Sequence, residues 1–358
     1  MSNAPKSNDP SFMIDHKTQA TIGTASIKRL CNLNVISLFS GGGGLDLGLE
    51  AAGFRTHFEN DIDPYSCSTL ELGRIAAAKR GLSILSNSVV LATDVKALEG
   101  DFVLESSQLK KGEVSLLAGG PPCQAFSVFG KRKGREDHRG QLVYEYFRLL
   151  SQIAPEAFLF ENVYGLLTVE KGAVFKMACE HLREPRKGLH YELSVLRLNA
   201  VNYGVPQFRD RVFIIGSREG KTIKEIDALT VDPRNHIGPS QLPFRTVKDA
   251  FRGLPKPNKK FPANHTGRNH SERIIERYGS MGPGERDHFT RINKLDLTKP
   301  SYTIIVGSDK GGGKGHIHPT APREVTPRES ARIQTFPDWW KFTGTVRHPI
   351  RQVGNAVY

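Results

Sequence analysis

Residues 34–50 read NVISLFSGGGGLDLGLE, in which a short apolar run leads through a glycine-rich turn into a segment of helical pattern. A run of this length is typical of a strand buried on both faces of a parallel sheet. Glycines at a strand-to-helix turn let backbone N–H groups approach a ligand closely, and the helix N-terminus adds partial positive charge. Taken alone, the stretch fits a ligand-binding turn and a purely structural tight turn.

Further short apolar runs follow the same plan, bounded by Gly, Asn or Asp and separated mostly by helix-length segments. With the first run at residues 35–39, they lie at residues 56–59, 88–91, 114–118, 157–160, 193–198 and 211–216. This alternation predicts an open α/β sheet of parallel strands joined by crossover helices. In such sheets ligands bind beyond the carboxyl ends of the strands, so the residues directly after each run are the candidates for chemistry.

Acidic residues follow the second and third runs. Asp61 comes about 20 positions after the glycines, where a carboxylate suits the two hydroxyl groups of a ribose. Asp94 is able to accept a hydrogen bond from an adenine amino group, and it is equally suited to capping the helix that follows it. Together with the glycine-rich turn, these residues predict a cofactor that contains a nucleoside.

The fourth run leads into GGPPCQAFS, residues 119–127. Two prolines fix the backbone directly before Cys123, at the edge of the sheet where the cofactor is expected. Glu161 follows the fifth run and so comes close to the same edge. A lone cysteine is more often inert and buried, and an acid after a strand is often a solvated loop residue. A thiol and a carboxyl converging on one cofactor site favour a catalytic centre.

Composition and charge limit the class of protein. The chain has 358 residues, 38% of them hydrophobic, which excludes a disordered or fibrous protein. No apolar run approaches the roughly 18 to 20 residues of a membrane span, and no secretory signal is present, so a soluble cytoplasmic protein is expected. The four cysteines lack the spacing of a zinc site, and no metal is expected. The net charge of +13 suggests nucleic acid as partner.

The character of the chain changes along its length. Residues 1–30 are polar without apolar periodicity, which predicts a flexible tail. Residues 245–320 are rich in Gly, Pro, Asn and His, and Lys and Arg outnumber Asp and Glu there. Residues 326–336 again show a helical pattern. We therefore expect a catalytic and cofactor-binding domain at residues 31–216, a small target-recognition domain at 217–341, and a return to the first domain at 342–358.

Five ordered blocks resemble the DNA (cytosine-5)-methyltransferases, in particular the bacterial restriction-modification members. They are GGPPCQ at 119–124, ENV at 161–163, QFRDR at 207–211, the residues Arg328, Glu329, Ala331, Arg332, Gln334, Phe336 and Pro337, and the residues Gln352, Gly354, Asn355 and Val357. The resemblance covers residues 34–357 except a variable stretch at about 217–299. It implies a Rossmann-like sheet, S-adenosyl-L-methionine as methyl donor and S-adenosyl-L-homocysteine as product.

The resemblance also implies the catalytic roles. Cys123 would add as thiolate to carbon-6 of cytosine, and Glu161 would bind and protonate the ring nitrogen opposite. Arg209 and Arg211 would organise the site, with Arg211 facing the cytosine O2 and a flanking phosphate. Because carbon-5 of a paired cytosine lies within the base stack, the base would have to turn out of the duplex.

Further contacts are implied residue by residue. The expected cofactor contacts are Phe39, Gly41, Gly43, Asp61, Ile62, Asp94, Pro122, Leu142 and Asn355. The expected DNA contacts are Gln124, Ser127, Lys131, Arg132, Arg139 and Gln207. The basic loop at residues 130–140 would close over DNA, and the small domain would read the base sequence.

Partners and rival functions follow from the same resemblance. Duplex DNA is the expected substrate, a cognate restriction endonuclease the expected companion, and a monomer without an obligate protein partner the expected state. The family continues past the last block with a proline and a further helix, so a chain ending at Tyr358 is expected to have a weakened fold or cofactor pocket. Two alternatives remain: an RNA cytosine-5-methyltransferase and a DNA-binding relative with impaired catalysis.

Overall fold

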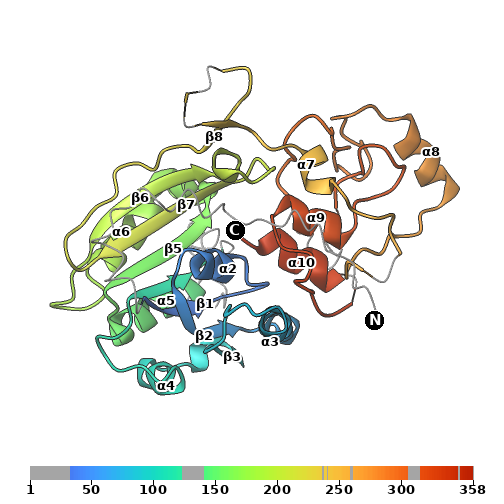
Figure 1. Cartoon of the computed structure of the whole chain (residues 1–358). Coiled ribbons are helices and arrows are strands. Elements are labelled where there is room, and N and C mark those ends of the chain that lie inside the picture. Colours follow the sequence, from blue (N-terminus) through green and yellow to red (C-terminus); the bar gives the residue numbers. More distant parts are fainter. Residues whose placement is uncertain are drawn as a thin grey trace.

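The computed structural model describes residues 33–122, 141–235, 238–239, 241–258, 261–304, 315–345 and 347–357. It has two lobes, one built on a large sheet and the other made of loops and short helices (Figure 1). The predicted N-terminal tail, Cys123 and the loop at 130–140 lie outside the described residues. Among the helices that are described, none is long and apolar enough to cross a membrane.

The large sheet has seven strands in the order β3-β2-β1-β4-β5-β7-β6. Their bounds are β1 Asn34–Leu38, β2 Arg55–Asp61, β3 Val89–Ala92, β4 Leu116–Gly119, β5 Ala157–Val163, β6 Glu192–Asn199 and β7 Asp210–Ser217. The predicted strands are confirmed with ends shifted by at most three residues. The open α/β sheet expected from the sequence is therefore present.

The expectation that every strand is parallel is wrong for the last pair. β7 runs antiparallel to both β5 and β6. Only residues 200–209 separate β6 from β7, and they contain a single turn of 3₁₀ helix, Ala200–Tyr203. A parallel crossover needs a dozen or more residues, so this link is too short to return the chain to the opposite end of the sheet.

Helices cover both faces of this sheet. The large core joins strand residues such as Ile36, Phe58 and Phe160 to the apolar sides of α4, α5 and α6. On the other face, Val35 and Leu116 pack with Leu49 of α2. The bounds are α2 Gly44–Ala51, α3 Pro64–Ala78, α4 Gly100–Ser106, α5 Gln141–Ile153 and α6 Ala173–Arg183. The first strand is thus fully enclosed, as its continuous apolar sequence predicts.

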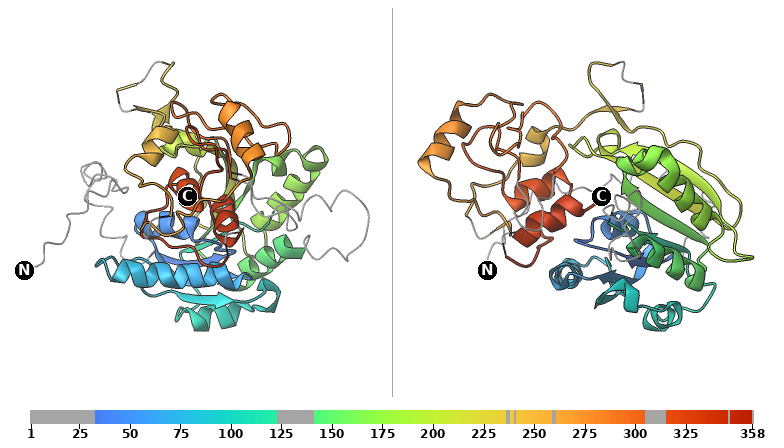
Figure 2. Two further views of the ribbon diagram at one scale, coloured as in Figure 1. Left: turned by 90° about the vertical axis from the view of Figure 1, so that its right-hand side faces the viewer. Right: turned by 180° about the vertical axis from the view of Figure 1, so that it is seen from behind.

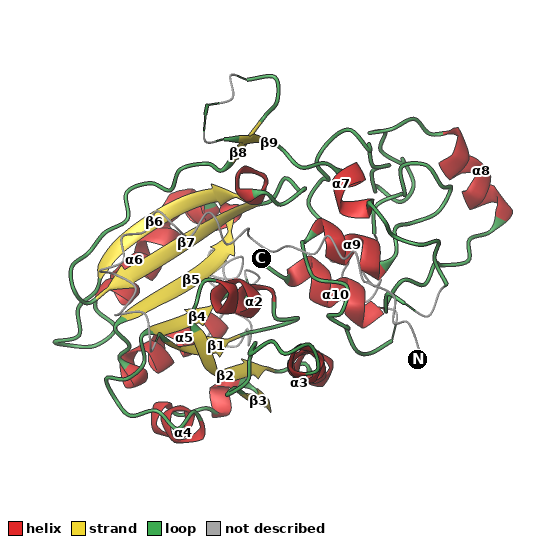
Figure 3. Ribbon diagram, in the orientation of Figure 1, coloured by secondary structure: helices red, strands yellow, loops and turns green. Residues whose placement is uncertain are grey.

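The second lobe contains few regular elements (Figure 3). They are β8 Thr230–Val231, β9 Leu242–Pro243, α7 Val247–Phe251, α8 Glu272–Ser280, α9 Pro327–Ile333 and α10 Arg347–Asn355. The helix expected at residues 326–336 is α9, which begins with a capping box between Thr326 and Glu329. A second core unites α9 and α10 with Leu47 of α2 and Leu70 of α3. These helices lie beside the sheet lobe in Figure 1 and in the right-hand view of Figure 2, and in front of it in the left-hand view of Figure 2.

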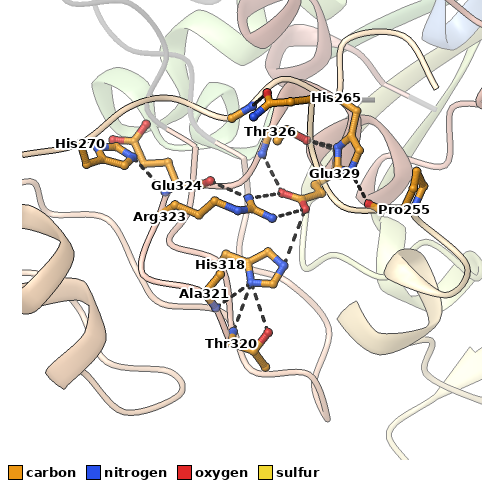
Figure 4. A network of polar contacts seen from close by, with 12 residues as sticks. Pro255, His265, His270, His318, Thr320, Ala321, Arg323, Glu324, Thr326 and Glu329 are labelled. Atoms are coloured by element: carbon orange, nitrogen blue, oxygen red, sulfur yellow. Dashed lines mark hydrogen bonds and ion pairs between the residues drawn. The ribbon is translucent and has the colours of Figure 1, made fainter. Parts of the chain in front are cut away.

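A polar network compensates for the scarcity of regular structure in this lobe (Figure 4). Arg323 donates to both oxygens of Glu329, at 2.8 and 2.7 Å. Thr326 donates its backbone N–H to the same carboxylate at 2.7 Å, and its side-chain oxygen lies 2.8 Å from His265 Nδ1. Since buried polar groups are costly unless they are paired, these bonds hold the loops in one arrangement.

Candidate active site

A pocket of about 540 Å³ opens at the carboxyl edge of the sheet. Register explains its position, because Leu38 of β1 pairs with Gly119 of β4, and Gly119 pairs with Phe160 of β5. The ends of β1, β2, β3, β4 and β5 therefore meet there. Its lining includes Phe39, Gly41, Asp61, Ile62, Asp94, Pro122, Leu142, Glu161 and Asn355. The pocket thus unites eight of the nine expected cofactor contacts with Glu161.

Asp61 is fixed at the end of β2 by backbone donors. Gly41 donates its N–H to Oδ2 at 2.9 Å, and Asp63 donates its N–H to Oδ1 at 2.8 Å. Burial raises the pKa of Asp61, while these two N–H groups oppose the rise. Each carboxylate oxygen keeps a second lone pair, so Asp61 is able to accept ribose hydroxyl groups from this position.

The glycine-rich turn forms one wall of the pocket through its backbone. Phe39 and Gly41 have φ angles of 58° and 56°, the left-handed region that suits glycine. Gly43 does not belong to the pocket lining. A Cβ atom at Gly43 would lie 2.7 Å from Leu70 and 2.9 Å from Trp340, so this glycine permits close packing of α2. The structure gives Gly43 a packing role, and the cofactor contact expected of it stays a prediction.

The remaining expected contacts suit the nucleoside part of a cofactor. Ile62 leaves 68% of its surface exposed at the pocket, which provides an apolar face for a base. Asp94 accepts the Lys96 N–H at 3.0 Å and so caps the 3₁₀ helix Val95–Ala97, while it also lines the pocket. The capping role is confirmed, and the adenine contact stays a prediction. A pocket of this volume with a pinned carboxylate and an apolar face fits S-adenosylmethionine.

Glu161 faces the pocket from β5 and pairs with a cation on the neighbouring strand. Arg211 Nε lies 2.8 Å from Glu161 Oε1. Burial raises the pKa of Glu161, and the charges of Arg211 and Arg209 oppose the rise. A Cβ atom at Gly120 would lie 2.5 Å from Glu161 Oε2, so only glycine allows the carboxyl group this close to the chain before Cys123.

Arg209 is buried behind this pair. Its Nη2 donates to the carbonyl oxygen of Gly354 at 2.9 Å, which connects the segment before β7 to the end of α10. Its Nε and Nη1 make no hydrogen bond with the described residues. Because Asn355 lines the pocket next to Gly354, this bond connects Arg209 to the wall of the cofactor pocket.

Gln207 does not face a DNA-binding surface. Its side chain is fully buried, Nε2 donates to Gln334 Oε1 at 2.9 Å, and Oε1 accepts the Ile304 N–H at 2.9 Å. The expected DNA contact is corrected to a structural link between the segment before β7, the end of α9 and residue 304. The other expected DNA contacts lie outside the described residues.

Several residues at the site carry roles that the sequence did not reveal. Asn162 donates its amide to the Pro121 carbonyl at 3.0 Å and so holds the turn before Cys123. Asp63 and Arg351 both line the pocket and form an ion pair. Asn162 belongs to the ENV block at residues 161–163, so the sequence marked its position but not its role. The pairing of Asp63 with Arg351 joins residues too far apart in sequence for a local pattern to show.

Comparisons with known proteins place the chain in a family. The model of the C-5 cytosine-specific DNA methylases matches residues 33–358. The type II methyltransferase M.AquIA of Picosynechococcus is 38% identical over 62% of this chain and 88% of its own length. M.XorII of Xanthomonas oryzae pv. oryzae, also a type II methyltransferase, is 32% identical over 90% of this chain and 81% of its own.

A solved structure agrees with these sequences. A candidate DNA modification methyltransferase encoded within an E. coli prophage has a TM-score of 0.68 and 29% identity, covering 91% of this chain and 94% of its own. The chain belongs to the C-5 cytosine-specific DNA methylase family. It is a DNA (cytosine-5)-methyltransferase with S-adenosylmethionine as methyl donor, and the family and fold expected from the sequence are confirmed. A family of DNA methylases favours DNA over the RNA alternative.

Proposed function

We propose that Cys123 and Glu161 are the catalytic residues of this methyltransferase and that the pocket beside them holds S-adenosylmethionine. The observation that carries the proposal is the buried Glu161 carboxyl group, which lines the same pocket as Asp61 and Pro122, the residue before Cys123. Arg211 pairs with the carboxyl group, and the charges of Arg211 and Arg209 oppose the effect of burial on its pKa.

The proposed roles divide the chemistry between Cys123 and Glu161. The Cys123 thiolate adds to carbon-6 of the flipped cytosine, and Glu161 holds a proton at the ring nitrogen opposite, which draws electron density from carbon-6. S-adenosylmethionine, when bound, supplies the methyl group for carbon-5. Loss of the carbon-5 proton then allows the bond between carbon-6 and the Cys123 sulfur to break.

The direct test is labelled methyl transfer from S-adenosylmethionine to duplex DNA, followed by nucleoside analysis. We expect the label in 5-methylcytosine. Label confined to adenine, or transfer to RNA alone, would refute the activity. Turnover that is absent while DNA binding persists would support the alternative of an impaired DNA-binding relative.

The biological setting is a finer proposal. Type II methyltransferases among the relatives support a restriction-modification system in the bacterial cytoplasm. A cognate endonuclease as companion and a monomeric enzyme complete the proposal. Residues 217–341 would supply target recognition, between the catalytic segments 31–216 and 342–358. Exchange of residues 245–299 for the matching stretch of a relative should change the methylated sequence found by bisulfite sequencing. An unchanged sequence would place recognition elsewhere.

A further inference from the structure

Two carboxylates stand at one rim of the cofactor pocket. Asp61 and Asp63 both line it, and the backbone N–H of Asp63 donates to Asp61 Oδ1 at 2.8 Å. Asp63 also begins α3 as its N-cap, accepting the Tyr65 N–H at 3.1 Å. The charge of Asp63 disfavours the ionised form of Asp61, and a cation beside Asp63 would offset this effect.

Arg351 is that cation, and it comes from the far end of the chain. Its Nη2 lies 2.6 Å from Asp63 Oδ2, and Arg351 itself lines the pocket. Neighbouring contacts fix α10 against α3: Thr69 donates its hydroxyl to Gln352 Oε1 at 2.7 Å, and Thr343 donates its hydroxyl to the Tyr65 carbonyl at 2.6 Å. These two contacts therefore hold the segment that carries Arg351 against the helix that begins at Asp63.

The charges around Asp61 come from several elements. Burial raises the pKa of Asp61, Asp63 raises it further, and Arg351 lowers it. The carboxyl group of Asp46 in α2 interacts electrostatically with Asp61, and the Cys67 thiol of α3 lies 3.5 Å from the Asp61 carbonyl oxygen. Arg351 is the cation that acts on Asp61 within this group.

We propose that Arg351 is a positioning residue for the cofactor, because its ion pair with Asp63 fixes the rim of the pocket and offsets the negative charge beside Asp61, the expected acceptor for the ribose hydroxyl groups. The inference rests on the proposed assignment of this pocket to S-adenosylmethionine. It predicts that the charge of Arg351 changes how cofactor affinity depends on pH.

Calorimetric titration with S-adenosylhomocysteine between pH 5 and pH 8 tests this role without turnover. Arg351→Gln should weaken binding by about tenfold at the acidic end, because a midpoint shift of one pH unit changes the ionised fraction by that factor. The midpoint of the pH profile should move upward. Arg351→Lys, which keeps the charge, should retain the wild-type midpoint.

A double substitution separates charge from structure. Asp63→Asn keeps an oxygen to cap α3 and removes one like charge, so Asp63→Asn combined with Arg351→Gln should bring the midpoint back toward the wild-type value. Arg347→Gln alters an exposed arginine on the same helix and should leave the midpoint unchanged. Melting temperatures of the unliganded variants report any loss of folding.

The outcomes distinguish this inference from the pocket assignment. If Asp61→Ala abolishes binding while Arg351→Gln leaves affinity and midpoint unchanged, the role of Arg351 is refuted and the pocket assignment stands. Equal weakening by Arg351→Gln at all pH values, without recovery in the double variant, also refutes the electrostatic role. If Asp61→Ala binds S-adenosylhomocysteine normally, the pocket assignment fails, and the inference fails with it.

Discussion

Arg211 Nε and Glu161 Oε1 lie 2.8 Å apart across the antiparallel pair of β7 and β5. The contact places a cation beside a carboxyl group that, in the proposed mechanism, has to hold a proton. Burial raises the pKa of Glu161 and the arginine lowers it, so the two effects oppose each other. Burial is the larger effect, so the pKa of Glu161 stays above its ordinary value, which favours the proton that its proposed role requires.

Replacement of Glu161 by Gln should slow methyl transfer by about 10² to 10⁴, the range for loss of a general acid. Affinity for S-adenosylhomocysteine should stay close to wild type, since the change removes little volume. Single-turnover kinetics and calorimetry measure the two effects. Glu170→Gln, at an exposed site beyond β5, is the matched control. Undiminished turnover in Glu161→Gln would contradict the assignment.

Gly120→Ala should displace the same carboxyl group. The added Cβ atom would stand 2.5 Å from Glu161 Oε2, and a shift of about 1 Å in a catalytic group can lower turnover by about a hundredfold. Gly48→Ala serves as control, because its Cβ atom would meet nothing within 4 Å. A fully active Gly120→Ala enzyme would show that Glu161 does not need this position.

Gln207→Met should reduce stability and spare DNA affinity. The substitution leaves the Ile304 N–H and the Gln334 amide oxygen without their partner, which should lower the free energy of unfolding by about 1 to 3 kcal/mol. Denaturant unfolding measures the loss, with the exposed Gln108→Met as control. Weaker DNA binding at unchanged stability would instead support the direct contact between Gln207 and DNA that the sequence suggests.

Stability should fall in mild acid because of His318. Its Nδ1 accepts the N–H groups of Thr320 and Ala321, at 3.2 and 3.0 Å, and burial lowers its pKa to about 4. The unfolded chain binds a proton near pH 6.5 and the folded one does not, so the free energy of unfolding should decrease as pH falls from about 6.5 to 4.

His318→Asn keeps an acceptor for these N–H groups and removes the titrating ring. Melting temperatures between pH 7.5 and 4.5 should therefore depend less on pH in this variant than in the wild type, whereas exposed His288→Asn should match the wild type. An unchanged slope in His318→Asn would assign the acid sensitivity to other groups.

The order of elements and the pocket were predictable because both depend on local sequence. An apolar run followed by glycine or an acid marks a strand end, and parallel strand ends share one edge, so Asp61, Asp94 and Glu161 come together. The fate of Gln207 was not predictable, because its amide is buried by Gln334 and Ile304, which are remote in sequence. The packing role of Gly43 was not predictable for the same reason, since Trp340 is remote in sequence.

Covalent capture on duplex DNA that contains 5-fluorocytosine tests the central claim most directly. Fluorine replaces the proton that must leave carbon-5, so the adduct cannot resolve. With S-adenosylmethionine present, peptide mass spectrometry should find the DNA attached to Cys123, and Cys123→Ser should form no adduct while Cys67→Ser and Cys179→Ser still do. An adduct formed by Cys123→Ser, or attachment to another residue in the wild type, would contradict the account.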